Sequence, residues 1–257
     1  MTYPNYQDKH KEESLVKATD FWVYKRELGH VPDISPPKGL IMCYSPTLFS
    51  YIKEEHNVKH IPNVYGDYFY ILEENGSQIG ICGDFGIGAP ITAILLEELS
   101  VFGIQNYLSM GVAGCLQKNI ELGTIIVCDK AIRDEGVSHH YLKSKKYAYP
   151  SKILVKKMLD TLEEKNLVYE VGTTWTIDTP YRETIAEVRK YRDEGVLTVE
   201  MEAAAIFSVA EYLNLNACAI FTISDYLTED KWELHFHLTK KHMENLFIIA
   251  KDFLLSL

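Results

Sequence analysis

Short apolar runs alternate along the chain with stretches in which apolar residues recur every three or four positions. A nearly uninterrupted apolar run, as at 217–223, predicts a strand buried on both faces. Helical spacing, as at 151–167, predicts a helix with one apolar face. On these criteria we expect strands at 39–44, 68–72, 79–82, 105–114, 124–128, 169–176 and 217–223. We expect helices at 47–56, 90–99, 151–167, 185–191, 201–212 and 238–255.

Strands and helices therefore alternate without a linker or a repeat, which predicts an α/β fold with a mixed central β-sheet flanked by helices. Asn75-Gly76 predicts a tight turn between two of the strands. Residues 1–38 are polar and end in a cluster of prolines, so we interpret them as an N-terminal extension. Residues 39–257 are expected to form one domain.

The net charge and the hydropathy of the chain limit the partners and the cellular location that we expect. Lys and Arg number 26 against 36 Asp and Glu, a formal net charge of −10, which argues against nucleic-acid and anionic-membrane partners. No apolar run approaches the roughly 20 residues that a membrane span needs. The polar N-terminus does not resemble a signal peptide. Five scattered cysteines predict buried thiols, and together these features predict a cytoplasmic protein.

Two glycine-bearing segments follow predicted strands. The segment 83–90 joins a strand to a helix, where backbone N–H groups can approach an anion, and Gly88 is the candidate contact. A dinucleotide fingerprint would require a glycine where Ile91 stands, which argues against an oxidoreductase of that type. The segment 109–114 could supply a pocket floor through Ala113 and Gly114. The alternative for both segments is a tight turn or close packing.

Carboxylates mark two further positions. Glu200 and Glu202 flank Met201 at the start of a predicted helix, and a carboxylate can accept two O–H hydrogen bonds from a vicinal diol. The alternative is capping of the helix N-terminus. Asp225, next to Ser224, ends the most apolar strand, where partial desolvation would suit a general acid. The alternative there is a turn or a cap.

Two segments, 133–141 and 175–183, mix arginine, carboxylate and aromatic residues, as a pocket for a planar heterocycle would. Trp175 could stack on a base, and Arg182 could hydrogen-bond its edge. A core tryptophan and a surface arginine are the alternatives. His139 and His140 lack a spaced third ligand, so no metal site is expected.

Taken in this order, the segments resemble the nucleoside phosphorylase family, which includes purine nucleoside phosphorylase, uridine phosphorylase and related nucleosidases. The similarity runs from about Gly39 to the C-terminus and rests on GIGAP at 86–90, GVAG at 111–114, VEMEAAA at 199–205 and ISD at 223–225. AIRDEGVSHHY and WTIDTPYRET are most similar to a uridine-phosphorylase-like branch. The resemblance implies a single-domain phosphorylase/hydrolase-like fold and a homo-oligomer, as a dimer, a trimer of dimers or a hexamer. It also implies cofactor-free cleavage of a nucleoside's N-glycosidic bond.

The resemblance also implies roles by position. Glu202 would bind the ribose 2′- and 3′-hydroxyls, with Met201 against the sugar. Asp225 would protonate or hydrogen-bond the base if it is a purine, and Trp175 would lie against it. Arg182 falls roughly where the uridine-specific branch recognises a pyrimidine. The resemblance leaves the choice between purine and pyrimidine open.

The same resemblance shows a degenerate phosphate site. Leu48 and Ser109 stand where phosphorylases of the family place arginines, and Val112 stands where they place a hydroxyl. Arg133 could supply a relocated phosphate contact. The glutamate with which family nucleosidases activate water is also missing from 42–46. The acceptor therefore stays open: the alternatives to phosphorolysis are a hydrolytic nucleosidase and a non-catalytic nucleoside-binding protein.

Overall fold

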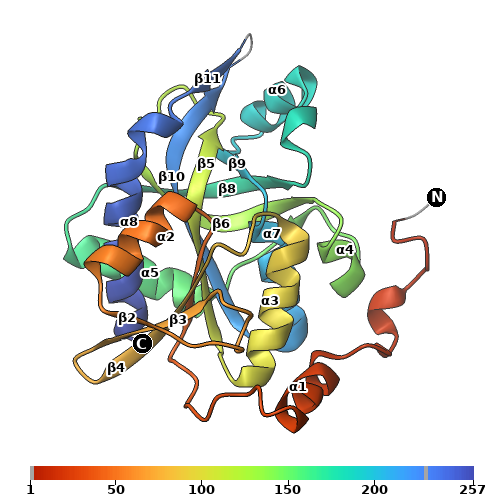
Figure 1. Ribbon diagram of the computed structural model, residues 1–257. Coiled ribbons are helices and arrows are strands. Elements are labelled where there is room, and N and C mark those ends of the chain that lie inside the picture. Colours follow the sequence, from red (N-terminus) through yellow and green to blue (C-terminus); the bar gives the residue numbers. More distant parts are fainter. Residues whose placement is uncertain (1–2, 229–230) are drawn as a thin grey trace.

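A mixed β-sheet with helices on both faces organises the computed structural model, which describes residues 3–228 and 231–257 (Figure 1). The strands are β1 (Leu40–Cys43), β2 (Val58–His60), β3 (Phe69–Glu74), β4 (Ser77–Gly83), β5 (Asn106–Cys115), β6 (Ile125–Asp134), β7 (Tyr147–Ala148), β8 (Tyr169–Ile177), β9 (Thr198–Glu200), β10 (Asn216–Leu227) and β11 (Trp232–Leu234). The helices are α1 (Ala18–Glu27), α2 (Pro46–Glu55), α3 (Ala89–Phe102), α4 (Ser138–Tyr141), α5 (Lys152–Glu164), α6 (Ile185–Asp193), α7 (Ala203–Leu213) and α8 (Lys240–Leu255).

The strand order contains a closed ring. Following the hydrogen-bonded pairs, the order is β11-β10-β6-β8-β9-β5-β1-β4-β3-β2, and β10 also pairs with β5. Because β10 has partners on both edges, strands β5, β9, β8, β6 and β10 surround a common centre. The ring contains both parallel pairs, such as β5 with β10, and antiparallel pairs, such as β5 with β9. The predicted mixed α/β fold is confirmed, and the ring is a feature that the pattern did not predict.

The register of this ring brings distant segments together at one glycine. Gly114 in β5 lies opposite Val199 of β9 on one edge and opposite Asp225 of β10 on the other. The β10 register shifts between Ile223 and Asp225, a bulge that redirects the strand at Ser224. The end of β5 therefore lies between Asp225 of β10 and the end of β9, where Glu200 follows Val199.

Two apolar layers hold the helices on the sheet. Helices α3 and α7 pack against each other over one face, while α2, α5 and α8 cover the other (Figure 1). Phe207 of α7 is buried in the first layer, and Phe247 and Phe253 of α8 are buried in the second. Both faces of the central strands are thus dry, which explains why these strands are apolar runs in the sequence.

Most predicted elements are present, with shifted ends. The turn at Asn75-Gly76 has both residues at positive φ, 52° and 74°, as a tight hairpin requires. The helix expected from residue 201 begins at Ala203, because Glu200–Glu202 precede it in extended and irregular conformations. Strands β2, β7, β9 and β11 span two or three residues each, too few for a periodic pattern to identify.

The N-terminal extension carries a helix that docks on the rest of the chain. Trp22 of α1 is 3% exposed and stacks on Phe102 of α3 with ring centroids 5.5 Å apart. Lys25 donates a hydrogen bond of 2.9 Å to the carbonyl of Val64. The extension is polar in composition, yet one apolar side chain anchors it.

Two further observations concern the described residues. None of their helices combines the length and the apolar character that a bilayer crossing would require. All five cysteines are buried and unpaired by disulfides, as the scattered spacing predicted.

Candidate active site

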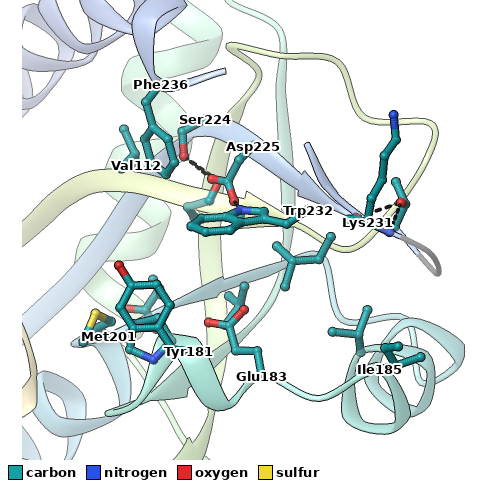
Figure 2. Close-up of a pocket in the computed structure, with 18 residues that line it drawn as sticks. Val112, Tyr181, Glu183, Ile185, Met201, Ser224, Asp225, Lys231, Trp232 and Phe236 are labelled. Carbon is teal, nitrogen blue, oxygen red and sulfur yellow. Dashed lines mark hydrogen bonds between the residues drawn. The ribbon is translucent and has the colours of Figure 1, made fainter. Parts of the chain in front are cut away.

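Two adjoining cavities, of about 450 and 720 Å³, open where β5, β9 and β10 meet. Figure 2 shows the smaller of them. We call the smaller one the first cavity and the larger one the second cavity. The first contains Ala113, Gly114, Ser224 and Asp225, and the second contains Glu202. The residues that line both are Val112, Pro180, Tyr181, Glu200, Met201, Trp232 and Phe236.

Glu200 organises the wall between the cavities. It is 6% exposed and accepts hydrogen bonds from the backbone N–H groups of Glu202 and Ala203, each 2.8 Å long. The Thr176 hydroxyl donates a third, of 2.5 Å. Glu200 therefore caps the N-terminus of α7, the structural role weighed for it above, and at the same time fixes the backbone of Glu202.

Glu202 is joined to the glycine-rich segment. Its Oε1 accepts a hydrogen bond of 2.6 Å from the backbone N–H of Gly88, which lies 114 residues earlier. Gly88 has φ +97°, a conformation that favours glycine. The N–H group predicted to approach an anion is thus directed at Glu202.

Burial raises the pKa of both Glu200 and Glu202, and the charge of Glu200 raises that of Glu202 further. Glu200 has three hydrogen-bond donors that favour its carboxylate form, whereas Glu202 has fewer. Glu202 is therefore the carboxyl group of the pair that keeps its proton more readily.

Asp225 is held at the floor of the first cavity. It is 4% exposed; one oxygen accepts a 2.6 Å hydrogen bond from the Ser224 hydroxyl, and the other accepts one of 2.6 Å from the indole N–H of Trp232. The bulge at Ser224 turns Asp225 toward the cavity. A Cβ on Gly114 would lie 2.6 Å from Leu227 Cδ1 and 3.1 Å from Asp225 Oδ2, so the carboxylate needs glycine beside it.

The aromatic walls of the first cavity come from residues that the sequence patterns did not indicate. Tyr181 and Trp232 face the cavity together with Phe236 (Figure 2). Tyr181 is 88% exposed and lies just beyond the end of β8. The signal available in the sequence was the position of each residue relative to the end of the strand. A side chain beyond that end can reach a cavity there, whereas a side chain within the strand packs in the core.

Trp175 shows this contrast, and the structure does not place it against a base. It lies inside β8, is 0% exposed, and donates its indole N–H to Asp134 at 2.9 Å. Its ring packs on Tyr191 of α6 with centroids 4.8 Å apart. The core-tryptophan alternative describes its position.

The two candidate arginines also lie outside both cavities. Arg182 is exposed and lines a shallow depression with Asp134 and Glu187. Arg133 is buried, and its guanidinium donates to the Ser138 hydroxyl and to the carbonyls of Ser138, Leu142 and Lys143. Four of its five N–H donors thereby hold the segment around α4, so a relocated phosphate contact at Arg133 does not fit this geometry.

The second cavity contains polar groups that the sequence analysis missed. Ser45 and Thr47 lie at the N-terminus of α2, where Ser45 Oγ accepts from the Leu48 N–H at 3.3 Å. His237 and Lys240, near the start of α8, line the same cavity. Among the described residues, no group of three or more His, Cys, Asp or Glu is arranged to hold a metal ion.

Comparison with known proteins shows which family the chain matches. The family model described as "Phosphorylase superfamily" matches residues 39–254. A guanosine phosphorylase of Halorubrum lacusprofundi is 33% identical over 143 residues, which cover 56% of this chain and 59% of that protein. The chain thus spans less than two thirds of that relative. A DeoD-type purine nucleoside phosphorylase of Alkaliphilus metalliredigens is 31% identical over 163 residues, 63% of this chain and 70% of that protein.

Solved structures extend the similarity. A uridine phosphorylase from Vibrio fischeri ES114 superposes with a TM-score of 0.72 at 27% identity, covering 85% of this chain and 90% of that one. A second structure of uridine phosphorylase from the same organism gives a TM-score of 0.71 at 28% identity, with 86% and 91% covered.

Proposed function

Because the chain belongs to the phosphorylase superfamily, we propose that it cleaves the N-glycosidic bond of a nucleoside with phosphate as acceptor, releasing the free base and ribose 1-phosphate. One observation carries the proposal. The register at Gly114 brings together Asp225 of β10 and the end of β9, two residues beyond which Glu202 lies, at the walls of two adjoining cavities.

Glu202 suits the sugar. A carboxylate can accept hydrogen bonds from both hydroxyls of a ribose diol, and Glu202 lines the second cavity next to Met201, which lines both. Glu200 acts as a positioning residue, because it accepts a hydrogen bond from the Glu202 N–H and so fixes the backbone from which the Glu202 side chain extends. The Gly88 N–H holds the far end of the same side chain.

The first cavity suits the base. Tyr181, Trp232 and Phe236 offer aromatic surfaces against which a planar heterocycle can stack. Asp225 and Ser224 lie at its floor as polar contacts. Since two relatives are named for purine substrates and two structures for uridine, the proposal includes both classes of base.

The second cavity suits the acceptor. Leu48 and Val112 line it where the family resemblance implies phosphate-binding side chains, and Ser109 is buried against the Tyr44 hydroxyl at 3.0 Å. We place phosphate instead between the hydroxyl groups at the α2 N-terminus and the side chains of His237 and Lys240. A charge-assisted hydrogen bond from Lys240 would contribute about 1.5–3 kcal/mol to its binding.

The test is chromatographic detection of free base from purine, pyrimidine and 5′-modified nucleosides, with and without phosphate. Release that requires phosphate supports the proposal. Lys240→Met should raise the phosphate KM at least about tenfold. Lys241→Met, which changes an exposed neighbour outside the cavity, should leave it unchanged.

Other outcomes identify the alternatives. Equal release with and without phosphate would make the protein a hydrolytic nucleosidase. Nucleoside binding without release of any base would make it a binding protein. A homo-oligomeric assembly and a cytoplasmic location are further parts of the proposal, supported by the family resemblance and by the buried thiols.

A further inference from the structure

Besides Asp225 and Glu200, the first cavity contains a third carboxyl group, Glu183, in a different setting from Asp225. It follows the short 3₁₀ turn Pro180–Arg182, and its side chain points into the cavity between Tyr181 and Trp232 (Figure 2). No hydrogen-bond partner for this carboxyl is present among the described residues. A polar group thus faces the space proposed for the base with its hydrogen-bonding capacity unused.

Asp225 is differently occupied. Both of its oxygens already accept hydrogen bonds of 2.6 Å, from the Ser224 hydroxyl and the Trp232 indole. Both oxygens of Asp225 are thus engaged in holding Trp232 and the floor of the cavity in place.

The electrostatic surroundings favour a proton on Glu183. Burial, together with the nearby charges of Asp225 and Glu187, raises the pKa of Glu183 to about 7. Glu200 also lines the cavity. Lys231 is the cationic side chain among the described lining residues, and its ammonium pairs with Glu233 at 3.3 Å. Near neutral pH a large fraction of Glu183 is therefore protonated.

We propose that Glu183 is the general acid that protonates the leaving base, an inference that rests on the proposed function. The bond between C1′ and the base nitrogen breaks, and its electron pair moves onto the base. The Glu183 carboxyl proton passes to the base, and a phosphate oxygen forms the new bond to C1′. Solvent then returns a proton to the Glu183 carboxylate, so that the step balances.

The test compares Glu183→Gln with Glu233→Gln, a neighbouring carboxyl outside both cavities. The first readout is the pH profile of kcat/KM on the nucleoside that the wild-type protein cleaves best. The wild type should lose activity as pH rises through about 7, because the acid must be protonated. Glu183→Gln should be about 100-fold slower and lack this decline. Glu233→Gln should keep both rate and decline.

The second readout is a nitrophenyl β-riboside, whose leaving group departs as a stable anion without a proton. Glu183→Gln should cleave it within about threefold of the wild-type rate, whereas a structural defect would slow both substrates equally. An unchanged pH decline in Glu183→Gln, or an equal loss on both substrates, overturns the inference while leaving the proposed function intact. If the wild type cleaves nothing, the proposed function fails, and this inference fails with it.

Discussion

At the scale of single residues, two carboxyl groups separated by one residue have different surroundings. Glu200 accepts three hydrogen bonds and caps the N-terminus of α7. Glu202 accepts a hydrogen bond from the N–H of Gly88 and has the acidic Glu200 as a neighbour. Placing both in a buried site costs free energy when both are ionised. Such a cost is common in binding sites, because a ligand can supply the hydrogen bonds that a buried carboxyl group otherwise lacks.

This arrangement predicts how stability depends on pH. The raised folded-state pKa values mean that the folded protein retains protons which the unfolded chain releases above about pH 4.5. Stability therefore falls as pH rises from there through the folded pKa values. Urea unfolding should show the wild type losing roughly 1–3 kcal/mol between mildly acidic and mildly alkaline pH from this pair. Glu202→Gln should lose less over the same range, and an equal loss in that variant would contradict the assignment.

The residue scale also shows which cavity-lining positions the sequence could indicate and which it could not. Glu202, Met201 and Asp225 could be predicted because strand ends and helix starts are visible in the sequence, and the structure brings them together. The sequence did not show which of the two aromatic residues, Trp175 or Tyr181, lines the cavity. Both are aromatic residues in one segment, and the difference is whether the side chain lies within β8 or beyond it.

At the scale of elements, the docking of α1 gives a stability prediction. Trp22→Ala removes a buried ring that stacks on Phe102 and should destabilise the protein by about 3–5 kcal/mol, measured by urea or thermal unfolding. Val23→Ala, on the exposed side of the same helix, should change stability by less than about 0.5 kcal/mol. Equal effects of the two substitutions would show that α1 does not depend on this contact.

Long elements could be predicted because each carries its own periodic pattern. The short strand β9 could not, since three residues have no period, yet it supplies the link that brings Glu200 to β5. The closure of the strands into a ring could not be predicted from the sequence either. An apolar run such as β10 shows that both faces are buried but does not identify which strands pair with its two edges.

At the scale of the whole molecule, the ring of strands brings the candidate site residues to one opening, while apolar layers pack on both faces of the sheet. Segments from the end of β5, from β9 and from β10 form the floor, and the residues around Tyr181 and Trp232 form the rim (Figure 2). The two cavities then separate the components of the proposed reaction. In the proposed arrangement the base would occupy the first cavity, the acceptor would occupy the second, and the sugar would lie beside Glu202 of the second cavity.

The central claim is that phosphate attacks the sugar. Phosphorus NMR of a reaction with a nucleoside that releases its base tests it most directly, because the sugar product either contains the phosphate or does not. We predict a ribose 1-phosphate signal that grows in equal amount with the free base, and loss of both in Glu202→Ala. Free ribose formed without any phosphate ester would contradict the claim.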